Sequence, residues 1–251
     1  MNLLLRNPFG YIVLQFTFEI SMRFKNLNSF FIPVALLFTL AAVSCSEKQT
    51  ETTKQEVISE KAEETKADQK TILFFGNSLT AAYGIDPEDG FAGLTQQRID
   101  SLGLNYRVIN GGLSGETTAG GVGRLDWFLE EKPDIFVLEL GGNDGLRGIA
   151  ISETKKNLML IIDKVREKYP DTKIILAGMQ IPPNMGTDYA REFTEIYPAV
   201  AEEKDVTLIP FLLENVGGIK ELNLPDGIHP TEEGHQIVFE TIWPYIQKNL
   251  E

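Results

Sequence analysis

Five short and largely apolar segments follow one another between residues 71 and 211. Stretches rich in buried-strand residues and without strict alternation are typical of parallel strands covered on both faces. Amphipathic stretches between them predict helices, and Thr231 with the two glutamates after it predicts the start of a last helix. This alternation predicts one three-layer α/β domain. The expected strands are TILFF (71–75), YRVIN (106–110), DIFVLEL (134–140), KIILAGM (173–179) and VTLIPF (206–211), and the expected helices are 90–102, 117–131, 152–168 and 187–204.

Residues 1–44 have the composition of a signal peptide region. An apolar run, SFFIPVALLFTLAAVS (29–44), follows Arg23 and Lys25 and ends in small residues. The run is shorter than the roughly 20 apolar residues that a membrane-spanning helix needs. Residues 1–21 add a second apolar piece that a signal peptide does not require, so we expect translation to start at Met22.

Cys45 follows this run and is the only cysteine of the chain, so no disulfide can form within one chain. The sequence Ala-Val-Ser-Cys (42–45) resembles the lipobox of bacterial lipoproteins. An incidental or buried thiol is the alternative, but the position of Cys45 between an apolar and a polar segment favours lipidation. We therefore expect an exported protein that a lipid on Cys45 anchors to a membrane, on its periplasmic or cell-surface face.

Residues 45–70 contain almost no large apolar side chains. Such a segment cannot bury enough surface to offset the entropy of ordering it, so we expect a disordered tether. The folded domain is then predicted over 71–251. The whole chain carries 36 acidic against 23 basic residues, a formal charge of -13, which argues against nucleic acid as a partner.

Glycine and polar residues follow the predicted strands. In an open parallel sheet, ligands bind beyond the carboxyl ends of the strands, so these segments are candidates for a functional site. A similar segment precedes the last predicted helix. The four segments are GNSLT (76–80), NGGLSG (110–115), GGND (141–144) and DGIHP (226–230).

A serine, a histidine and an aspartate in these segments could form a catalytic triad. The chain has only two histidines, and His229 lies three residues after Asp226, whose carboxylate can bind one ring nitrogen and leave the other for a nucleophile. His235 lies among apolar residues of the last predicted helix, which favours a packing role. Ser78, on a tight turn after the first strand, is the predicted nucleophile, whereas Ser114 is expected to shape a glycine-rich loop.

Three hydrogen-bond donors are available for an oxyanion hole, which binds the negative charge of an acyl-transfer transition state. They are the backbone N–H groups of Ser78 and Gly112 and the side-chain amide of Asn143. Taken singly, Gly112 could be a packing glycine and Asn143 a turn residue. Their joint occurrence at successive strand ends favours the oxyanion hole.

With these blocks in this order, the chain resembles the SGNH hydrolases, also called GDSL esterases, over residues 71–250. The resemblance implies a flavodoxin-like fold with five parallel strands in the order 2-1-3-4-5 and no metal or organic cofactor. It implies the nucleophile at Ser78, the partners of the nucleophile at Asp226 and His229, and the oxyanion donors at Gly112 and Asn143.

Further stretches resemble the bacterial multifunctional esterase, thioesterase and lysophospholipase I branch, which acts on thioesters, aryl esters and lysophospholipids. By this resemblance Leu146, Arg147 and Gly148 belong to a mobile substrate-binding loop, although an ordinary solvated loop is an equal alternative. The stretches are LELGGNDGLRG (138–148), IPPN (181–184) and EIYPAVAEEKDVTLIPF (195–211).

One position departs from the family pattern. The first block reads Gly-Asn-Ser-Leu, where the family usually has Gly-Asp-Ser-Leu, so Asn77 keeps the shape of the side chain and loses its charge. An amide can still donate and accept hydrogen bonds, and we expect activity to survive.

The expected function is therefore a serine esterase that hydrolyses aryl or short acyl esters, thioesters or lysophospholipids. Two alternatives stay open: a carbohydrate O-deacetylase, and a catalytically silent lipoprotein that binds a lipid or glycan. Asn77, the one departure from the family pattern, is the only feature of the sequence that favours the silent lipoprotein.

Overall fold

The structure is a computed structural model, and it describes residues 69–182 and 185–251. The expected signal peptide, the start at Met22, the lipidation site Cys45 and most of the tether predicted over 45–70 lie outside the described residues. At the end of that predicted tether, Lys70 is already the first residue of a strand. Within the described part of the chain, no helix is long and apolar enough to cross a membrane.

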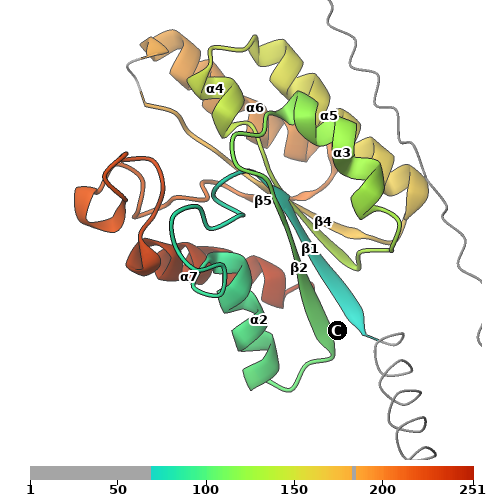
Figure 1. Cartoon of the computed structure of the whole chain (residues 1–251). Helices are drawn as coiled ribbons and strands as arrows, with labels where there is room; N and C mark the ends of the chain where they lie inside the picture. The colour runs from blue at the N-terminus through green and yellow to red at the C-terminus, as the bar shows by residue number, and fades with distance from the viewer. Residues whose placement is uncertain (1–68, 183–184) are drawn as a thin grey trace, which may run out of the picture. The chain divides into compact units, whose positions relative to one another are not determined.

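Five parallel strands form one sheet in the order β2-β1-β3-β4-β5 (Figure 1). This confirms the predicted strand order. Strand β1 lies inside the sheet and pairs with both β2 and β3, and Gly76 at its carboxyl end is aligned with Gly112 and Glu139. The strands are β1 (Lys70–Gly76), β2 (Tyr106–Gly112), β3 (Ile135–Glu139), β4 (Lys173–Ala177) and β5 (Thr207–Ile209).

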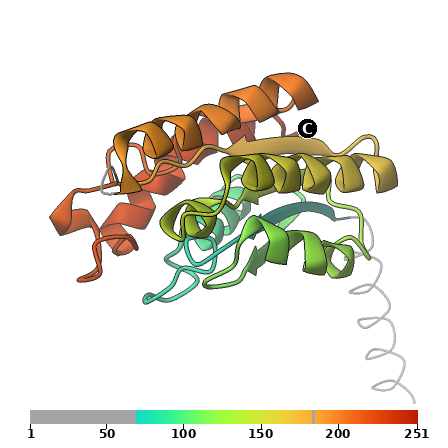
Figure 2. The ribbon, with the colours of Figure 1, turned by 90° about the horizontal axis from the view of Figure 1, so that it is seen from above.

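Helices cover both faces of the sheet. Helices α2 and α7 pack together on one face, while α3, α5 and α6 lie on the other, as Figures 1 and 2 show. The predicted three-layer α/β architecture is thus confirmed, and only the short α4 and the 3-10 turn η2 were not expected. The elements are α2 (Phe91–Ser101), α3 (Thr118–Phe128), α4 (Gly142–Leu146), α5 (Ile151–Lys168), α6 (Thr187–Lys204), η2 (Lys220–Leu222) and α7 (Glu232–Gln247).

The core explains why β1 is apolar at consecutive positions. Successive side chains of a strand point to opposite faces of the sheet. The Phe74 ring packs edge-on against Phe91 of α2, with ring centroids 5.6 Å apart, and the next residue, Phe75, packs against Phe128 of α3 at 5.5 Å. Both layers of helices therefore pack on apolar side chains of β1, the strand that precedes the candidate nucleophile Ser78.

Candidate active site

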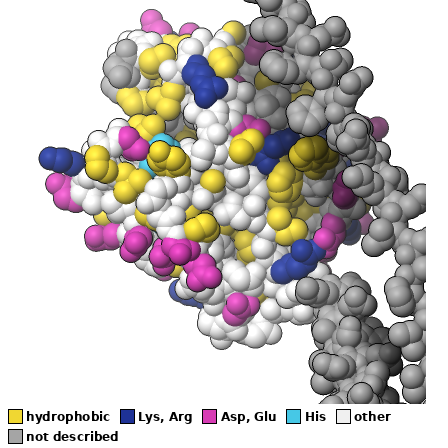
Figure 3. All heavy atoms as spheres, in the orientation of Figure 1, with side chains coloured by type: hydrophobic (Ala, Val, Ile, Leu, Met, Phe, Trp, Pro, Cys, Tyr) yellow, Lys and Arg dark blue, Asp and Glu magenta, His cyan; other side chains and the backbone are white. Residues whose placement is uncertain are grey.

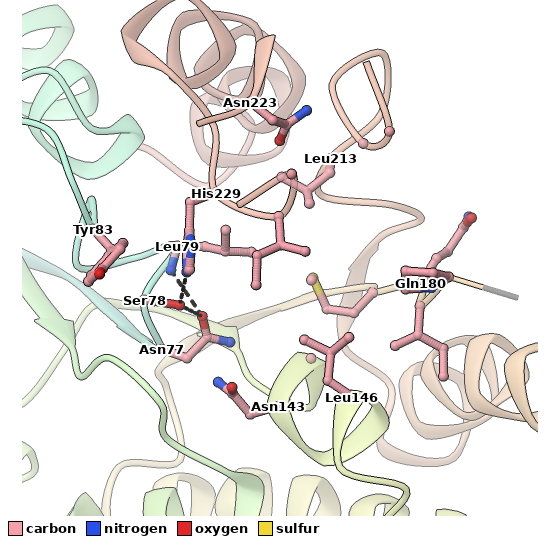
Figure 4. Close-up of a pocket in the computed structure, with 18 of the residues that line it drawn as sticks. Asn77, Ser78, Leu79, Tyr83, Asn143, Leu146, Gln180, Leu213, Asn223 and His229 are labelled. Atoms are coloured by element: carbon pink, nitrogen blue, oxygen red, sulfur yellow. Dashed lines mark hydrogen bonds between the residues drawn. The ribbon is translucent and has the colours of Figure 1, made fainter. Parts of the chain in front are cut away.

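Ser78, His229 and Asp226 form one hydrogen-bonded chain. Ser78 lies two residues after the end of β1, and the other two residues lie in the loop before α7. The distance from Ser78 Oγ to His229 Nε2 is 2.8 Å, and that from His229 Nδ1 to Asp226 Oδ2 is 2.7 Å. Figure 4 shows the imidazole ring of His229 directly above the hydroxyl of Ser78. The structure therefore brings together all three residues of the predicted triad.

The loop that carries Asp226 and His229 is held at both ends. Leu224 N–H donates to the carbonyl of His229 at 2.7 Å, and Thr231 caps α7 by accepting a bond from Gly234 N–H at 3.2 Å. Partial burial raises the pKa of Asp226, but hydrogen bonds from Ile228 N–H and from His229 outweigh it, so this pKa lies below its ordinary value. The carboxylate thus stays ionised and can stabilise a positively charged imidazole.

Asn143 belongs to α4, the next element after β3 in the chain, and it lines the same cavity as Ser78. Its Nδ2 donates to the carbonyl of Glu116 at 3.0 Å. An amide nitrogen carries two hydrogens, so this bond fixes the side chain and leaves one N–H for a substrate. The position of Asn143 suits the predicted oxyanion donor.

Gly112 does not reach the cavity. It is the last residue of β2, and its N–H donates to Asn110 Oδ1 at 3.0 Å. Gly115, three residues later, lines the cavity instead and has a positive φ of 80°. The sequence-based expectation for Gly112 is therefore not met, because the register of β2 keeps this residue within the sheet while the loop beyond it turns into the cavity.

Side chains of α3 and α4 hold the loop that contains Gly115. Arg147, at the end of α4, donates to the carbonyl of Gly115 at 2.8 Å. Arg124 of α3 forms an ion pair with Glu116, and both side chains are largely buried. Arg124 also donates to the carbonyls of Gly76 and Gly111 at 3.0 and 2.8 Å, so it joins the carboxyl ends of β1 and β2.

A cavity of about 500 Å³ opens beside the triad, and its wall is mostly apolar. Leu146 lines it, as the resemblance implied, whereas Arg147 is not among the lining residues. Hydrophobic side chains also gather around the histidine that is visible at the surface in Figure 3, so the mouth of the cavity is apolar too. The apolar lining residues are Leu79, Leu146, Met179, Ile181, Pro182, Phe211, Leu213 and Ile228.

Tyr83 and Gly115 were missed as site residues by the sequence reasoning. The ring centroid of Tyr83 lies 4.6 Å from that of His229, at the mouth of the cavity, and about half of the tyrosine is exposed. A tyrosine five residues after Ser78 carries no signal of its own, because the turn that folds it back is visible only in the structure.

Glu139, the last residue of β3, is also a new feature of the site. It is fully buried beneath the turn of Ser78, and its carboxylate accepts a 2.7 Å bond from Asn77 Nδ2. Burial raises the pKa of Glu139 to about 7 despite the hydrogen bonds that it accepts. Asn77 thus uses its amide both to donate and to accept, since its Oδ1 accepts from Leu79 N–H at 3.0 Å.

His235 has the packing role that the sequence predicts. It is 1 % exposed, its ring stacks on Phe91 at 5.7 Å, and its Nδ1 accepts a bond from the backbone N–H of Phe91. Burial is the main cause that lowers the pKa of His235, to about 4, so the ring is neutral near pH 7. His229 is therefore the one histidine that faces Ser78.

Comparison with known proteins agrees with this geometry. The chain is 42% identical to Esterase TesA of Pseudomonas aeruginosa, over 73% of this chain and 91% of that protein. It is 33% identical to Thioesterase 1/protease 1/lysophospholipase L1 of Escherichia coli K12, over 70% of this chain and 83% of that protein. A crystal structure of TesA superposes with a TM-score of 0.69 at 42% identity, over 72% of this chain and all of that one.

Residues 74–237 match the family described as the GDSL-like lipase/acylhydrolase family, and this range includes every residue of the triad. This match, the identity to the relatives above and the shared fold together show that the chain belongs to the GDSL-like lipase/acylhydrolase family.

Proposed function

We propose that the protein is a serine esterase, which hydrolyses carboxylic esters through an acyl-enzyme on Ser78. The observation that carries this proposal is the hydrogen-bonded chain of Ser78, His229 and Asp226 at the mouth of an apolar cavity. A serine hydroxyl is a weak nucleophile until a neighbouring base takes its proton, and the 2.8 Å contact with His229 Nε2 provides that base.

In the first half of the reaction, Ser78 Oγ attacks the carbonyl carbon of the ester while its proton passes to His229 Nε2. The carbonyl oxygen becomes an oxyanion, and the donors proposed for it are the N–H groups of Ser78 and Gly115 and the amide of Asn143, three residues that line the cavity. In this proposal, Gly115 takes the role that was predicted for Gly112. The intermediate collapses when His229 donates this proton to the departing alcohol or thiol, which leaves the acyl group on Ser78.

In the second half, a water molecule replaces the alcohol. His229 takes one proton from the water, the hydroxide attacks the acyl carbon, and a second oxyanion forms at the same donors. Its collapse releases the carboxylic acid and returns the proton to Ser78 Oγ. Asp226 keeps its negative charge throughout and stabilises the imidazolium of His229 at each stage.

The substrate class follows from the cavity. Its apolar wall suits the acyl chain or aryl group of an ester, a thioester or a lysophospholipid, and Leu146 of α4 contributes to that wall. The printed name of the Escherichia coli relative includes thioesterase and lysophospholipase activities. A carbohydrate O-deacetylase would need a polar wall for a glycan, and a silent binding protein would not need the aligned triad.

The proposal is tested with a panel of a short aryl ester, an acyl-CoA, a lysophospholipid and an acetylated glycan. We expect turnover of at least one of the first three and its loss in Ser78→Ala. Ser114→Ala is the matched control, because Ser114 lines the cavity without a histidine partner, and it should keep most of the activity. Turnover of the glycan alone, or full activity of Ser78→Ala, would contradict the proposal.

We further propose that the protein is exported and anchored to a membrane by a lipid on Cys45. The support lies in the sequence, where a basic pair, an apolar run of 16 residues (29–44) and the lipobox-like Ala-Val-Ser-Cys follow one another. A tether between Cys45 and the domain would place the esterase near the membrane surface, where lysophospholipids reside.

A further inference from the structure

Glu139 is a fully buried carboxylate whose hydrogen bonds all come from the turn that carries the nucleophile. Its Oε2 accepts from the backbone N–H of Asn77 at 3.1 Å and from the N–H and hydroxyl of Thr80 at 3.3 and 2.8 Å. Its Oε1 accepts from Asn77 Nδ2 at 2.7 Å. Each of these four donors lies within two residues of Ser78, although Glu139 itself belongs to another strand.

Asn77 links Glu139 to Ser78, because its side chain contacts both residues. Because Nδ2 faces the carboxylate, Oδ1 must point the other way, where it accepts from Leu79 N–H at 3.0 Å. Oδ1 also lies 3.4 Å from Ser78 Oγ, farther than the 2.8 Å between Ser78 Oγ and His229 Nε2. The hydroxyl hydrogen therefore has its nearer acceptor in the histidine, as proton transfer requires.

The contacts of Asn77 fix which end of its side-chain amide is the nitrogen and which is the oxygen. With the amide reversed, its oxygen would face a carboxylate and its nitrogen would face the N–H of Leu79. Gly76 makes the close approach possible, because a side chain at that position would collide with Glu139 and Thr80. The turn is thus built around one carboxylate and one amide.

We infer that Glu139 and Asn77 are a matched carboxylate and amide pair, in which Glu139 is a positioning residue that orients the nucleophile Ser78 through Asn77. This inference rests on the proposed function and adds two residues to its site. It also gives a physical reason for asparagine at position 77, since an aspartate there would set two carboxylates 2.7 Å apart in a buried place.

The pair can be taken apart by substitution. In Glu139→Gln, one carboxylate oxygen is replaced by an NH₂ group. This NH₂ group must face either Asn77 Nδ2 or the N–H groups of the turn, all of which are donors. At least one buried donor therefore loses its acceptor. A buried unsatisfied group commonly costs enough to change a rate about tenfold or more. We expect kcat to fall by about that factor with KM nearly unchanged, because the nucleophile is misplaced while the apolar cavity is intact.

Asn77→Asp is expected to behave differently. Two close buried carboxyls share one proton, and the shared proton would replace the lost amide hydrogen. Relative to the parent at the same pH, activity should therefore persist near neutral pH and fall as the pH rises and the pair loses that proton. The other groups near this pair are Tyr197 of α6, whose pKa is raised by burial and by Glu139, Arg124 of α3, which binds the carbonyl of Gly76, and the triad residue His229.

The double variant Asn77→Asp with Glu139→Gln decides the question. Here the amide at position 139 donates to the carboxylate at position 77, while its oxygen still accepts the three bonds that Oε2 receives in the parent. All groups are partnered and no proton is shared. We expect kcat to return to within about threefold of the parent, without the alkaline loss of Asn77→Asp.

The experiment measures kcat and KM against pH for the parent and the three variants, together with thermal unfolding. Asp134→Asn is the matched control: Asp134 accepts a 2.8 Å bond from Thr71 N–H at the far end of β1, so its loss should lower stability and leave kcat unchanged. If Glu139→Gln does not fold, Asn77→Asp and the double variant still decide.

A double variant as impaired as Glu139→Gln, or a Glu139→Gln variant with parental kcat, would overturn the inference while the parent remains active. A parent that turns over no ester would instead overturn the proposed function and the inference with it. The unfolding midpoints provide an independent readout: if the pair is matched, the double variant is more stable than the two single changes predict by addition.

Discussion

Asn143 is held from behind by the carbonyl of Glu116, and this bond fixes the direction of its free N–H. We expect Asn143→Ala to lower kcat by roughly 10²–10³-fold with a small change in KM, because the donor acts on charge that exists only in the transition state. Steady-state kinetics on an aryl ester measure this effect. Asn157→Ala is the control, since Asn157 donates to Thr118 Oγ1 and is not among the residues that line the cavity. Equal losses in both variants would contradict the role of Asn143.

At the level of single residues, the sequence predicted Ser78, Asn143, Asp226 and His229 but placed one donor wrongly. Several glycines occur in NGGLSG (110–115), and only the direction of the backbone separates Gly112 from Gly115. Glu139 was invisible for another reason. It ends an apolar strand, and its proximity to Asn77 arises from the pairing of β1 with β3.

Helix α3 contributes to the site through Arg124, which packs over the rings of Phe75 and Phe128 and binds two strand-end carbonyls. Arg124→Met would keep most of the packing but leave Glu116 charged and buried without a partner. We expect a loss of about 3–5 kcal/mol in the free energy of unfolding. Denaturant unfolding measures it.

Adding Glu116→Gln to Arg124→Met removes the uncompensated charge and should recover part of the lost stability. A double variant that is less stable than Arg124→Met would show that charge burial is not the cause. Both variants keep the backbone carbonyl of Glu116, which accepts the bond from Asn143. A change in kcat measured on fully folded variants would therefore report a shift of the loop that contains Gly115 and Glu116.

Helix α7 gives the protein a pH-dependent stability through His235. Its pKa is lowered to about 4 by burial, from an ordinary value of 6.5, so the unfolded chain binds its proton first as the pH falls. The free energy of unfolding is therefore unaffected above about pH 6.5 and decreases between there and about pH 4, by roughly 3 kcal/mol in total.

His235→Gln keeps an acceptor for Phe91 N–H and should remove this decrease. Glu139 acts with the opposite sign, because its raised pKa of about 7 makes stability fall as the pH rises towards 7. The prediction thus concerns the difference between variant and parent, measured by denaturant unfolding at several pH values. A constant difference between pH 4 and 7 would contradict it.

Among the elements, the five long helices were predictable from their amphipathic patterns, and the five strands were predictable from their short, continuous apolar runs. The predicted helix over 187–204 is α6 with the same bounds, even though Pro198 lies inside it. Helix α4 was missed because five residues with two glycines carry no periodic signal. Strand β5 is only Thr207–Ile209, shorter than its apolar run, because the chain turns into the cavity wall at Phe211.

For the whole molecule, the proposed anchor predicts where the protein is found. We expect the native protein in the membrane fraction, and we expect Cys45→Ala to move it to the soluble fraction with unchanged activity on a short aryl ester. Cell fractionation with immunoblotting measures this, and Cys45→Ala combined with Ser78→Ala serves as an inactive control. A protein that stays in the membrane fraction after Cys45→Ala would contradict the lipid anchor.

The central claim is that Ser78 is an activated nucleophile. The most direct measurement is labelling with a serine-reactive fluorophosphonate, followed by mass spectrometry of the labelled peptide. We predict a single label on Ser78, absent in Ser78→Ala and much slower in His229→Ala, because the hydroxyl then lacks its base. An unlabelled protein, or a label on Ser114, would contradict it.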